Sequence, residues 1–211
     1  MYKLAVVGTL LATTQAHIHP VNEEIIEQIK ARATTWIPME MEENPLHHKS
    51  IDTVIGMLGT VFDTDSDFPE PELNQSNAAL PTNFDARTQW GNCVHDIRDQ
   101  ASCGSCWAFG SSEALSDRFC IKSGGKTNVV LSAEDLVACD KSDLACDGGY
   151  LNKAWNYLAT TGIVSEACFP YSSGKGVVPS CPKSCTGTGS FTKYKCQANS
   201  VVTARTAATI Q

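Results

Sequence analysis

The chain has 211 residues, enough for one or two domains with a hydrophobic core, and its ten cysteines are typical of proteins that fold in an oxidising compartment. The formal net charge is −7, and no stretch is basic enough to indicate a nucleic-acid-binding protein. After the first residues, no apolar run approaches the ~18 residues that a membrane span needs, so we expect neither a nucleic-acid nor a membrane partner.

Residues 1–16 are typical of a secretory signal peptide. Lys3 precedes an apolar run over residues 4–12, and the small residue Ala16 precedes the expected cleavage point. The alternative is a buried N-terminal strand, which these flanking residues disfavour. The sequence therefore predicts a soluble protein that enters the secretory pathway.

Acidic residues are concentrated in the N-terminal part of the chain. Residues 17–79 carry twelve acidic and three basic side chains, whereas residues 80–211 carry eleven acidic and twelve basic ones. This asymmetry indicates two parts with separate roles.

The N-terminal part is predicted to contain one amphipathic helix. Asn22 can cap it, because Glu23 and Glu24 follow in the first turn and basic residues follow in later turns. Four apolar residues recur at helical spacing and predict a single stripe, which ends before Pro38. These residues are Ile26, Ile29, Ala33 and Trp36. One helix cannot bury such a stripe alone, so it should pack on another part of the chain.

Residues 62–81 have the composition of an exposed linker, acidic and rich in Pro, Asn and Ser. Asn74 begins an N-glycosylation sequon, which fits a surface location.

After this linker, a compact domain is predicted to begin near Asn83. A helix is expected over residues 106–119, with small or apolar side chains on two faces, so it should be buried on both sides. Ser132 can cap a second, short helix, and a third over residues 151–161 should stop at Gly162.

Four interpretations compete for Cys103 and Cys106, which lie three residues apart. A zinc site would need a second close pair, and Cys181 and Cys185 lie about 75 residues further on. A thioredoxin-type redox pair would follow a strand in a βαβ pattern, which this sequence does not show. The remaining interpretations are two structural disulfide halves, or a reactive nucleophile at Cys106.

The position of Cys106 at the start of the expected helix favours the nucleophile. Unpaired N–H groups and the helix dipole stabilise a thiolate there, and only the thiolate attacks a carbonyl carbon. Cys103 lies outside the helix and is better suited to a disulfide. Gly104 lets a substrate backbone approach closely, because it has no side chain.

These residues carry a family resemblance. Gln100 followed by Cys103-Gly-Ser-Cys106-Trp resembles the active-site signature of papain-like cysteine proteases. Four further stretches are similar to the cathepsin B-like members of that family. They are Leu80–Arg87, Ile97–Gln100, Ser132–Leu136 and Cys146–Tyr150. Several motifs in the family's order are far more specific than two cysteines alone.

The resemblance implies an α+β fold with two lobes, of which this sequence holds mostly the helical left lobe, while the β-barrel right lobe is largely missing. It also implies a signal peptide over residues 1–16, an inhibitory propeptide over 17–79 and an incomplete peptidase domain over 80–211. The activity would be that of a cysteine-type endopeptidase, made as a secretory zymogen for a lysosome, a vacuole or the cell exterior. Its partners would be protein or peptide substrates and its own propeptide, with no cofactor and no metal.

The resemblance implies roles for individual residues. Cys106 would be the nucleophile that forms an acyl-enzyme, and Gln100 would donate a side-chain N–H to the oxyanion hole beside the backbone N–H of Cys106. Gly148 and Gly149 would offer bare backbone that pairs with an extended peptide, although a simple turn is their alternative. Asp147 stands where the family usually has Asn, so this loop is expected to be adjusted.

Four disulfides are implied by the same resemblance. The pairs would be Cys93–Cys120, Cys103–Cys146, Cys139–Cys181 and Cys168–Cys185. Cys106 would stay free as the nucleophile, and Cys196 is left over, at a position where the family's cysteine pairs with one close to the C-terminus.

A thiol protease also needs an imidazole base and a group that orients it. His95 is the one histidine after residue 80, and we expect it to be structural rather than a substitute base. The family's His and Asn lie about 130–150 residues beyond the nucleophile, but 105 residues follow Cys106. With the unpaired Cys196, this predicts a C-terminally truncated form that is inactive alone. The alternative functions are a non-catalytic, cathepsin-like secreted binding protein and a disulfide oxidoreductase.

Two expectations concern specificity and activation. Cys168 and Cys181 enclose twelve residues without a histidine, where cathepsin B carries a histidine-bearing occluding loop that directs it to C-terminal dipeptides. The resemblance therefore implies an endopeptidase with an open cleft. The acidic propeptide is expected to lie over that cleft through its Ile26, Ile29 and Trp36 stripe, and protonation of its carboxylates should trigger maturation at low pH.

Overall fold

The computed structural model describes residues 19–62, 68–69 and 82–206. The expected signal peptide, the Asn74 sequon and most of the expected linker lie outside the described residues. The chain divides into two compact units, Met1–Val54 and Ile55–Gln211, which are described separately. Within the described residues, no helix is both long and apolar enough to span a bilayer.

The first unit contains helix α1 (Glu23–Lys30), the short 3-10 helix η1 (Met41–Glu43) and the start of α2 (Ile51–Gly56). Asn22 caps α1 as predicted, because its side chain accepts a hydrogen bond of 3.0 Å from the backbone N–H of Ile25. Lys30, at the last turn, donates to the carboxylates of Glu27 and Glu40, each at 2.9 Å.

The predicted length of this first helix is wrong. The helix ends at Lys30, and the N–H groups of Arg32 and Ala33 both turn back to the carbonyl oxygen of Ile29. Trp36 therefore lies outside the helix and is 58% exposed, so the expected stripe stops at Ile29. Thr34 and Thr35, two β-branched residues, follow this turn, and Pro38, three residues after Thr35, restricts only the residue before it.

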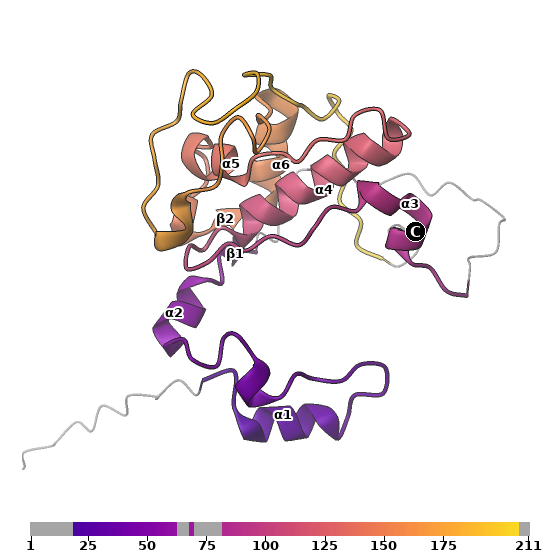
Figure 1. The fold of residues 1–211 in the computed structure, drawn as a ribbon, viewed down its shortest axis with the longest axis vertical. Helices are drawn as coiled ribbons and strands as arrows, with labels where there is room; N and C mark the ends of the chain where they lie inside the picture. The colour runs from indigo at the N-terminus through magenta and orange to yellow at the C-terminus, as the bar shows by residue number, and fades with distance from the viewer. Residues whose placement is uncertain (1–18, 63–67, 70–81, 207–211) are drawn as a thin grey trace, which may run out of the picture. The chain divides into compact units, whose positions relative to one another are not determined.

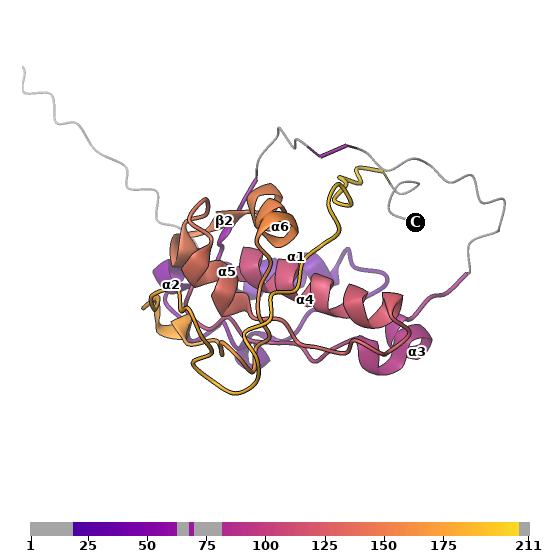
Figure 2. The same ribbon diagram turned by 90° about the horizontal axis from the view of Figure 1, so that it is seen from above.

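The second unit is built around α4 (Cys106–Lys122), with α5 (Ala133–Cys139) and α6 (Leu151–Thr160) packed against it (Figure 1). The short helices α3 (Ala86–Trp90) and η2 (Gly91–Cys93) lie near the C-terminal end of α4 (Figure 2). Two 3-10 turns complete the unit, η3 (Ala145–Asp147) and η4 (Ser173–Lys175).

Helix α4 is buried on two sides, as its sequence predicts. Trp107 and Ala108 are fully buried at its start, and Ser111 and Ser112 are buried one turn later. The two serine hydroxyls donate to carbonyl oxygens of α4 itself, so that these polar groups are satisfied inside the core. The helix continues three residues beyond the predicted end at residue 119.

The two neighbouring helices follow the predicted capping signals. The Ser132 hydroxyl accepts a hydrogen bond of 3.0 Å from the N–H of Asp135 at the start of α5. Helix α6 ends one residue before Thr161, and Gly162 then adopts a φ of +76°, a left-handed conformation that glycine tolerates.

Strand structure is sparse in the described residues. The one sheet there pairs β1 (Thr60–Val61) with β2 (Gly149–Tyr150) in parallel, with Thr60 opposite Gly149. The second unit is therefore mainly helical, and β1 lies beside the start of α4, where the Thr60 hydroxyl meets the Cys106 sulfur.

Four disulfides cross-link this unit, two of them at cysteines of α4 and α5. They are Cys93–Cys120, Cys103–Cys146, Cys139–Cys181 and Cys168–Cys185. Cys106 and Cys196 carry free thiols.

Candidate active site

Cys106 is the first residue of α4 and is partly exposed. Its neighbour in the motif, Cys103, is bonded to Cys146. The two cysteines of the motif are therefore neither a redox pair nor two ligands of one zinc ion. No group of three or more potential metal-ligating side chains occurs among the residues that the structure describes.

Residues 57–61, which we call the covering segment, lie across Cys106. The Thr60 hydroxyl is 3.2 Å from the Cys106 sulfur. Two residues that precede Thr60 in the same segment also accept hydrogen bonds. The side-chain amide of Gln100 donates to the Met57 carbonyl oxygen at 2.8 Å, and the N–H of Gly149 donates to the Gly59 carbonyl oxygen at 2.8 Å. Every expected element of the site thus touches the covering segment.

Three glycines allow this close approach. A Cβ atom on Gly59 would lie 1.8 Å from the carbonyl oxygen of Gly104, and one on Gly104 would lie 2.5 Å from that of Cys146. A Cβ on Gly149 would lie 2.4 Å from the ring of Trp107. These separations are far below van der Waals contact, so a side chain at any of the three positions would force the backbones apart.

Gly148 and Gly149 belong to residues 140–150, which we call the glycine loop. Gly148 has a φ of +114°, which only glycine adopts readily. The disulfide between Cys103 and Cys146 joins this loop to the segment before the nucleophile, and the Gly104 N–H adds a hydrogen bond of 3.0 Å to the Cys146 carbonyl oxygen. Asp147 is exposed.

The side-chain amide of Gln100 already donates to two carbonyl oxygens. Besides the Met57 carbonyl oxygen, its nitrogen donates to the Cys103 carbonyl oxygen at 2.9 Å. The donor expected to stabilise an oxyanion is therefore bound to a carbonyl oxygen of the covering segment.

Two further side chains hold the site together, and no sequence pattern assigns them this role. The Tyr171 hydroxyl accepts from the Ser105 hydroxyl and donates to the Gln100 carbonyl oxygen, both at 2.9 Å, so it fixes the residues on either side of the motif. Burial raises the pKa of Tyr171. The indole N–H of Trp107 donates to the Ala145 carbonyl oxygen at 3.1 Å and anchors the glycine loop.

His95 is not near Cys106. One ring nitrogen lies 2.6 Å from a carboxylate oxygen of Asp117, and the other lies 2.6 Å from the Asn128 side-chain oxygen. Asp117 follows Cys106 by eleven residues on α4, which at 1.5 Å per residue places it about 16 Å away. The histidine therefore has the structural role that we expected.

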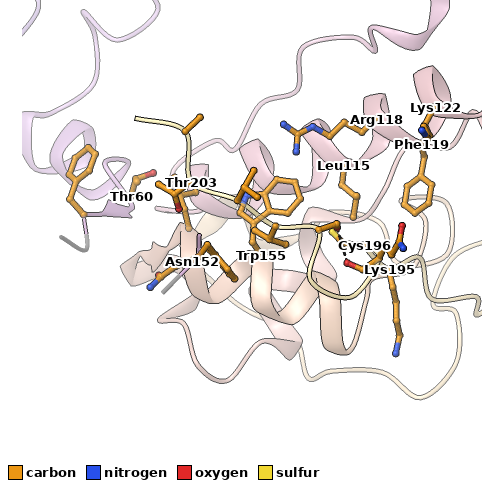
Figure 3. A pocket seen from close by; sticks show the side chains of 18 of the residues that line it. Thr60, Leu115, Arg118, Phe119, Lys122, Asn152, Trp155, Lys195, Cys196 and Thr203 are labelled. Carbon is orange, nitrogen blue, oxygen red and sulfur yellow. Dashed lines mark hydrogen bonds between the residues drawn. The ribbon is translucent and has the colours of Figure 1, made fainter. Parts of the chain in front are cut away.

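A cavity of about 1040 Å³ opens beside the covering segment, between α4, α6 and residues 195–204 (Figure 3). Thr60 belongs to its lining, together with Phe119 of α4 and Trp155 of α6. The free thiol of Cys196 also lines the cavity, and burial raises its pKa.

Comparison with known proteins decides the family. Residues 80–211 match the family model described as papain family cysteine protease. The chain belongs to the papain family of cysteine proteases.

Its relatives within the family are cathepsin B-like. The chain is 36% identical over 204 residues to cathepsin B-like cysteine proteinase 4 of Caenorhabditis elegans, a match that covers 85% of this chain and 59% of the relative. It is 46% identical over 129 residues to cathepsin B of Dictyostelium discoideum, covering 57% and 39% of the two chains. The chain thus spans between two fifths and three fifths of the length of these curated relatives.

Solved structures agree with this assignment. Procathepsin B S9 from Trypanosoma congolense superposes with a TM-score of 0.72 at 26% identity, over 83% of this chain and 63% of the other. Procathepsin L2 from Tenebrio molitor gives 0.59 at 25% identity, over 71% and 49%. The predicted papain-like fold is confirmed, and the mainly helical described residues correspond to its left lobe.

Proposed function

We propose that this chain is the zymogen form of a cathepsin B-like cysteine endopeptidase, in which Cys106 is the nucleophile and the covering segment occupies the substrate cleft. The contact of 3.2 Å between the Thr60 hydroxyl and the Cys106 sulfur carries the proposal. It puts a segment of the acidic N-terminal part on the one free cysteine that begins a helix.

The residues around Cys106 suit acyl transfer. The thiolate would attack the carbonyl carbon of a peptide bond and form a thioester, with release of the amine half of the substrate. Negative charge on the carbonyl oxygen would be stabilised by the side-chain amide of Gln100 and the backbone N–H of Cys106. Water would then hydrolyse the thioester and restore the thiol.

The imidazole base of this reaction would come from the part of the family fold that this chain does not span. Relatives extend well beyond the matched region, and His95 is bonded elsewhere. We therefore propose that activity belongs to a protein with both lobes and that this chain alone is inactive.

The covering segment has the properties of an inhibitor rather than a substrate. Its main-chain oxygens bind Gly149 and Gln100, as an extended peptide would, but a hydroxyl oxygen faces the sulfur. No carbonyl carbon is presented for attack through this contact. Residues 17–79 would thus act as a propeptide, and their acidic character would make its release faster at low pH.

An endopeptidase requires a cleft that is open at both ends. The twelve residues between Cys168 and Cys181 contain no histidine, and the structure bonds these cysteines to Cys185 and Cys139 rather than to each other. We propose that this stretch leaves the cleft open. We also propose that the protein is secreted or delivered to a lysosome or vacuole.

The proposal is tested on protein carried to the full length of the family fold, after removal of the propeptide. An epoxide inhibitor of thiol proteases should modify Cys106 and abolish cleavage within a long peptide, and the Cys106→Ser variant should be neither modified nor active. Modification of Cys196 in place of Cys106 would refute the assignment. Absence of any labelling would favour the alternative, a non-catalytic binding protein. That alternative is supported by one observation: none of the described residues places a histidine beside Cys106. Release of successive C-terminal dipeptides would contradict the open cleft.

A further inference from the structure

Helix α4 begins after a serine that does not cap it. Ser105 stands at the N-cap, yet its side chain accepts no hydrogen bond from the helix. In α1, α3 and α5 the N-cap side chain does accept such a bond, and there the N-cap residue is extended. Ser105 instead has a φ of −106° and a ψ of 18°. Its backbone is therefore not in the extended conformation from which a serine oxygen reaches the first N–H groups of a helix.

The Ser105 hydroxyl is bound to Tyr171 instead. Ser105 is fully buried, and its side-chain oxygen lies 2.9 Å from the Tyr171 hydroxyl oxygen. Tyr171 donates its one proton to the Gln100 carbonyl oxygen at 2.9 Å, so Ser105 must be the donor in the other contact. Tyr171 is itself held firmly. Its N–H donates to the Glu166 carboxylate at 2.8 Å, and its ring meets that of Phe109 edge-on, with 4.7 Å between the centroids.

The first N–H groups of α4 are left open by this arrangement. The Ser105 carbonyl oxygen accepts from the N–H of Ala108 at 2.9 Å and of Phe109 at 3.1 Å. Among the described residues, nothing accepts from the N–H of Cys106 or of Trp107. Open N–H groups form the positive end of the helix dipole. A capping oxygen at this end would compete with the Cys106 sulfur, and with a substrate oxygen, for the same groups.

We infer that Tyr171 is a positioning residue, which keeps the Ser105 hydroxyl from capping α4 and so reserves the first N–H groups of the helix for Cys106 and its substrate. Without the Tyr171 hydroxyl, Ser105 turns to the extended conformation and caps the N–H of Trp107. Its oxygen then offsets part of the positive field at Cys106, and a smaller fraction of the thiol is ionised at a given pH. The use of this arrangement in catalysis rests on the proposed function, whereas the capping itself does not.

Amide hydrogen exchange of the 211-residue chain tests the missing cap. In the wild type, the Trp107 amide should exchange about fivefold faster or more than the Asp135 amide, after correction for intrinsic rates, because Ser132 caps Asp135. In Tyr171→Phe, which keeps the aromatic ring, exchange of the Trp107 amide should slow by about fivefold. Tyr157→Phe is the matched control. It removes the hydroxyl of a partly buried tyrosine of α6 and should leave the Trp107 amide unchanged.

Alkylation of Cys106 by iodoacetamide tests the effect on the thiol. The rate at pH 6, divided by the rate on the alkaline plateau, reports the ionised fraction and cancels any change in access to the sulfur, which the uncharged Thr60 hydroxyl faces. This ratio should fall about threefold in Tyr171→Phe. It should return to the wild-type value in the double variant Ser105→Ala, Tyr171→Phe, because alanine cannot cap. Both variants lack the bond to Gln100, so the comparison isolates Ser105.

Recovery in the double variant is the decisive result, since a Tyr171 that merely supports the fold would leave both variants equally altered. A double variant no better than Tyr171→Phe would therefore overturn the inference. So would a wild-type Trp107 amide that is as protected as that of Asp135, a comparison that needs no variant. Failure of Tyr171→Phe to fold, while Tyr157→Phe folds, would also overturn it. The amide exchange keeps its meaning even if Cys106 proves not to be a nucleophile.

Discussion

The two regions that meet over Cys106, the covering segment and the glycine loop, are held in place by different kinds of interaction. The glycine loop is fixed by a disulfide, by the buried indole of Trp107 and by the carboxylate of Asp143. The covering segment is held through main-chain oxygens and one hydroxyl, with no covalent link and no buried charge in those contacts. Under the proposed function, the glycine loop would therefore remain in the mature enzyme, whereas the covering segment would be removed with the propeptide.

The largest effect is expected from a substitution that removes the support of the glycine loop. Trp107 is fully buried, and its ring lies against Gly149, so Trp107→Ala should lower the free energy of unfolding by about 3–5 kcal/mol. Urea denaturation of the whole chain measures this loss. Trp90→Ala, at a position that is 39% exposed, is the matched control and should cost about 1 kcal/mol or less. Equal losses in the two variants would mean that Trp107 does not anchor the loop.

A smaller effect, confined to the position of the covering segment, is expected from a substitution at Gly59. In the Gly59→Ala variant the added Cβ meets the Gly104 carbonyl oxygen, so the covering segment should be displaced while the domain stays folded. Alkylation of Cys106 by iodoacetamide should become faster by about tenfold or more, equivalent to about 1.4 kcal/mol of lost contact. The labelled peptide is identified by mass spectrometry.

Gly56→Ala is the control for this change. A Cβ at Gly56 has no atom within 4 Å, although its carbonyl oxygen lies close to Gly104. Its labelling rate should match that of the wild type. If both variants, or neither, expose Cys106, the segment is not seated through Gly59.

The smallest effect is a dependence of the unfolding free energy on pH, through Asp143 of the glycine loop. The pKa of Asp143 is raised in the folded protein to about 6 from an ordinary value of 3.8. The folded state therefore holds this proton more tightly than the unfolded state, so the stabilisation is complete below pH 4 and is lost as the pH rises through 6. Relative to Asp143→Asn, the wild type should lose about 1–2 kcal/mol of unfolding free energy between pH 4 and pH 7, allowing for screening by water. A constant difference between the two proteins across this range would contradict the assignment.

The sequence predicts the glycine loop and the helices around it better than the covering segment. Helical periodicity, the Ser132 cap and the Gly162 stop are local signals, so α4, α5 and α6 could be placed within a few residues. The family resemblance of the motif around Cys106 also points to Gln100 and Gly149 as residues of the same site. The first helix was predicted too long, because Ala33 and Trp36 continue the apolar spacing although the backbone already turns after Lys30.

The position of the covering segment could not be predicted, because its contacts have no local signature in the sequence. Thr60 meets Cys106 across 46 positions of sequence, and Gly59 looks like any glycine before a β-branched residue. The burial of Asp143 is equally hidden, since an aspartate in a polar loop is usually solvated. Only the fold shows that its second oxygen is buried.

The central claim, that Cys106 is a free thiol beneath Thr60, is tested most directly by a Thr60→Cys variant under mild oxidation. With an oxygen-to-sulfur distance of 3.2 Å in the native protein, the new thiol should form a disulfide with Cys106, seen as a linked peptide by mass spectrometry. Val61→Cys is the control, because successive side chains of a strand point to opposite faces, and it should leave Cys106 free. A Cys106 that stays unlinked in the Thr60→Cys variant, or links equally in both, would contradict the account.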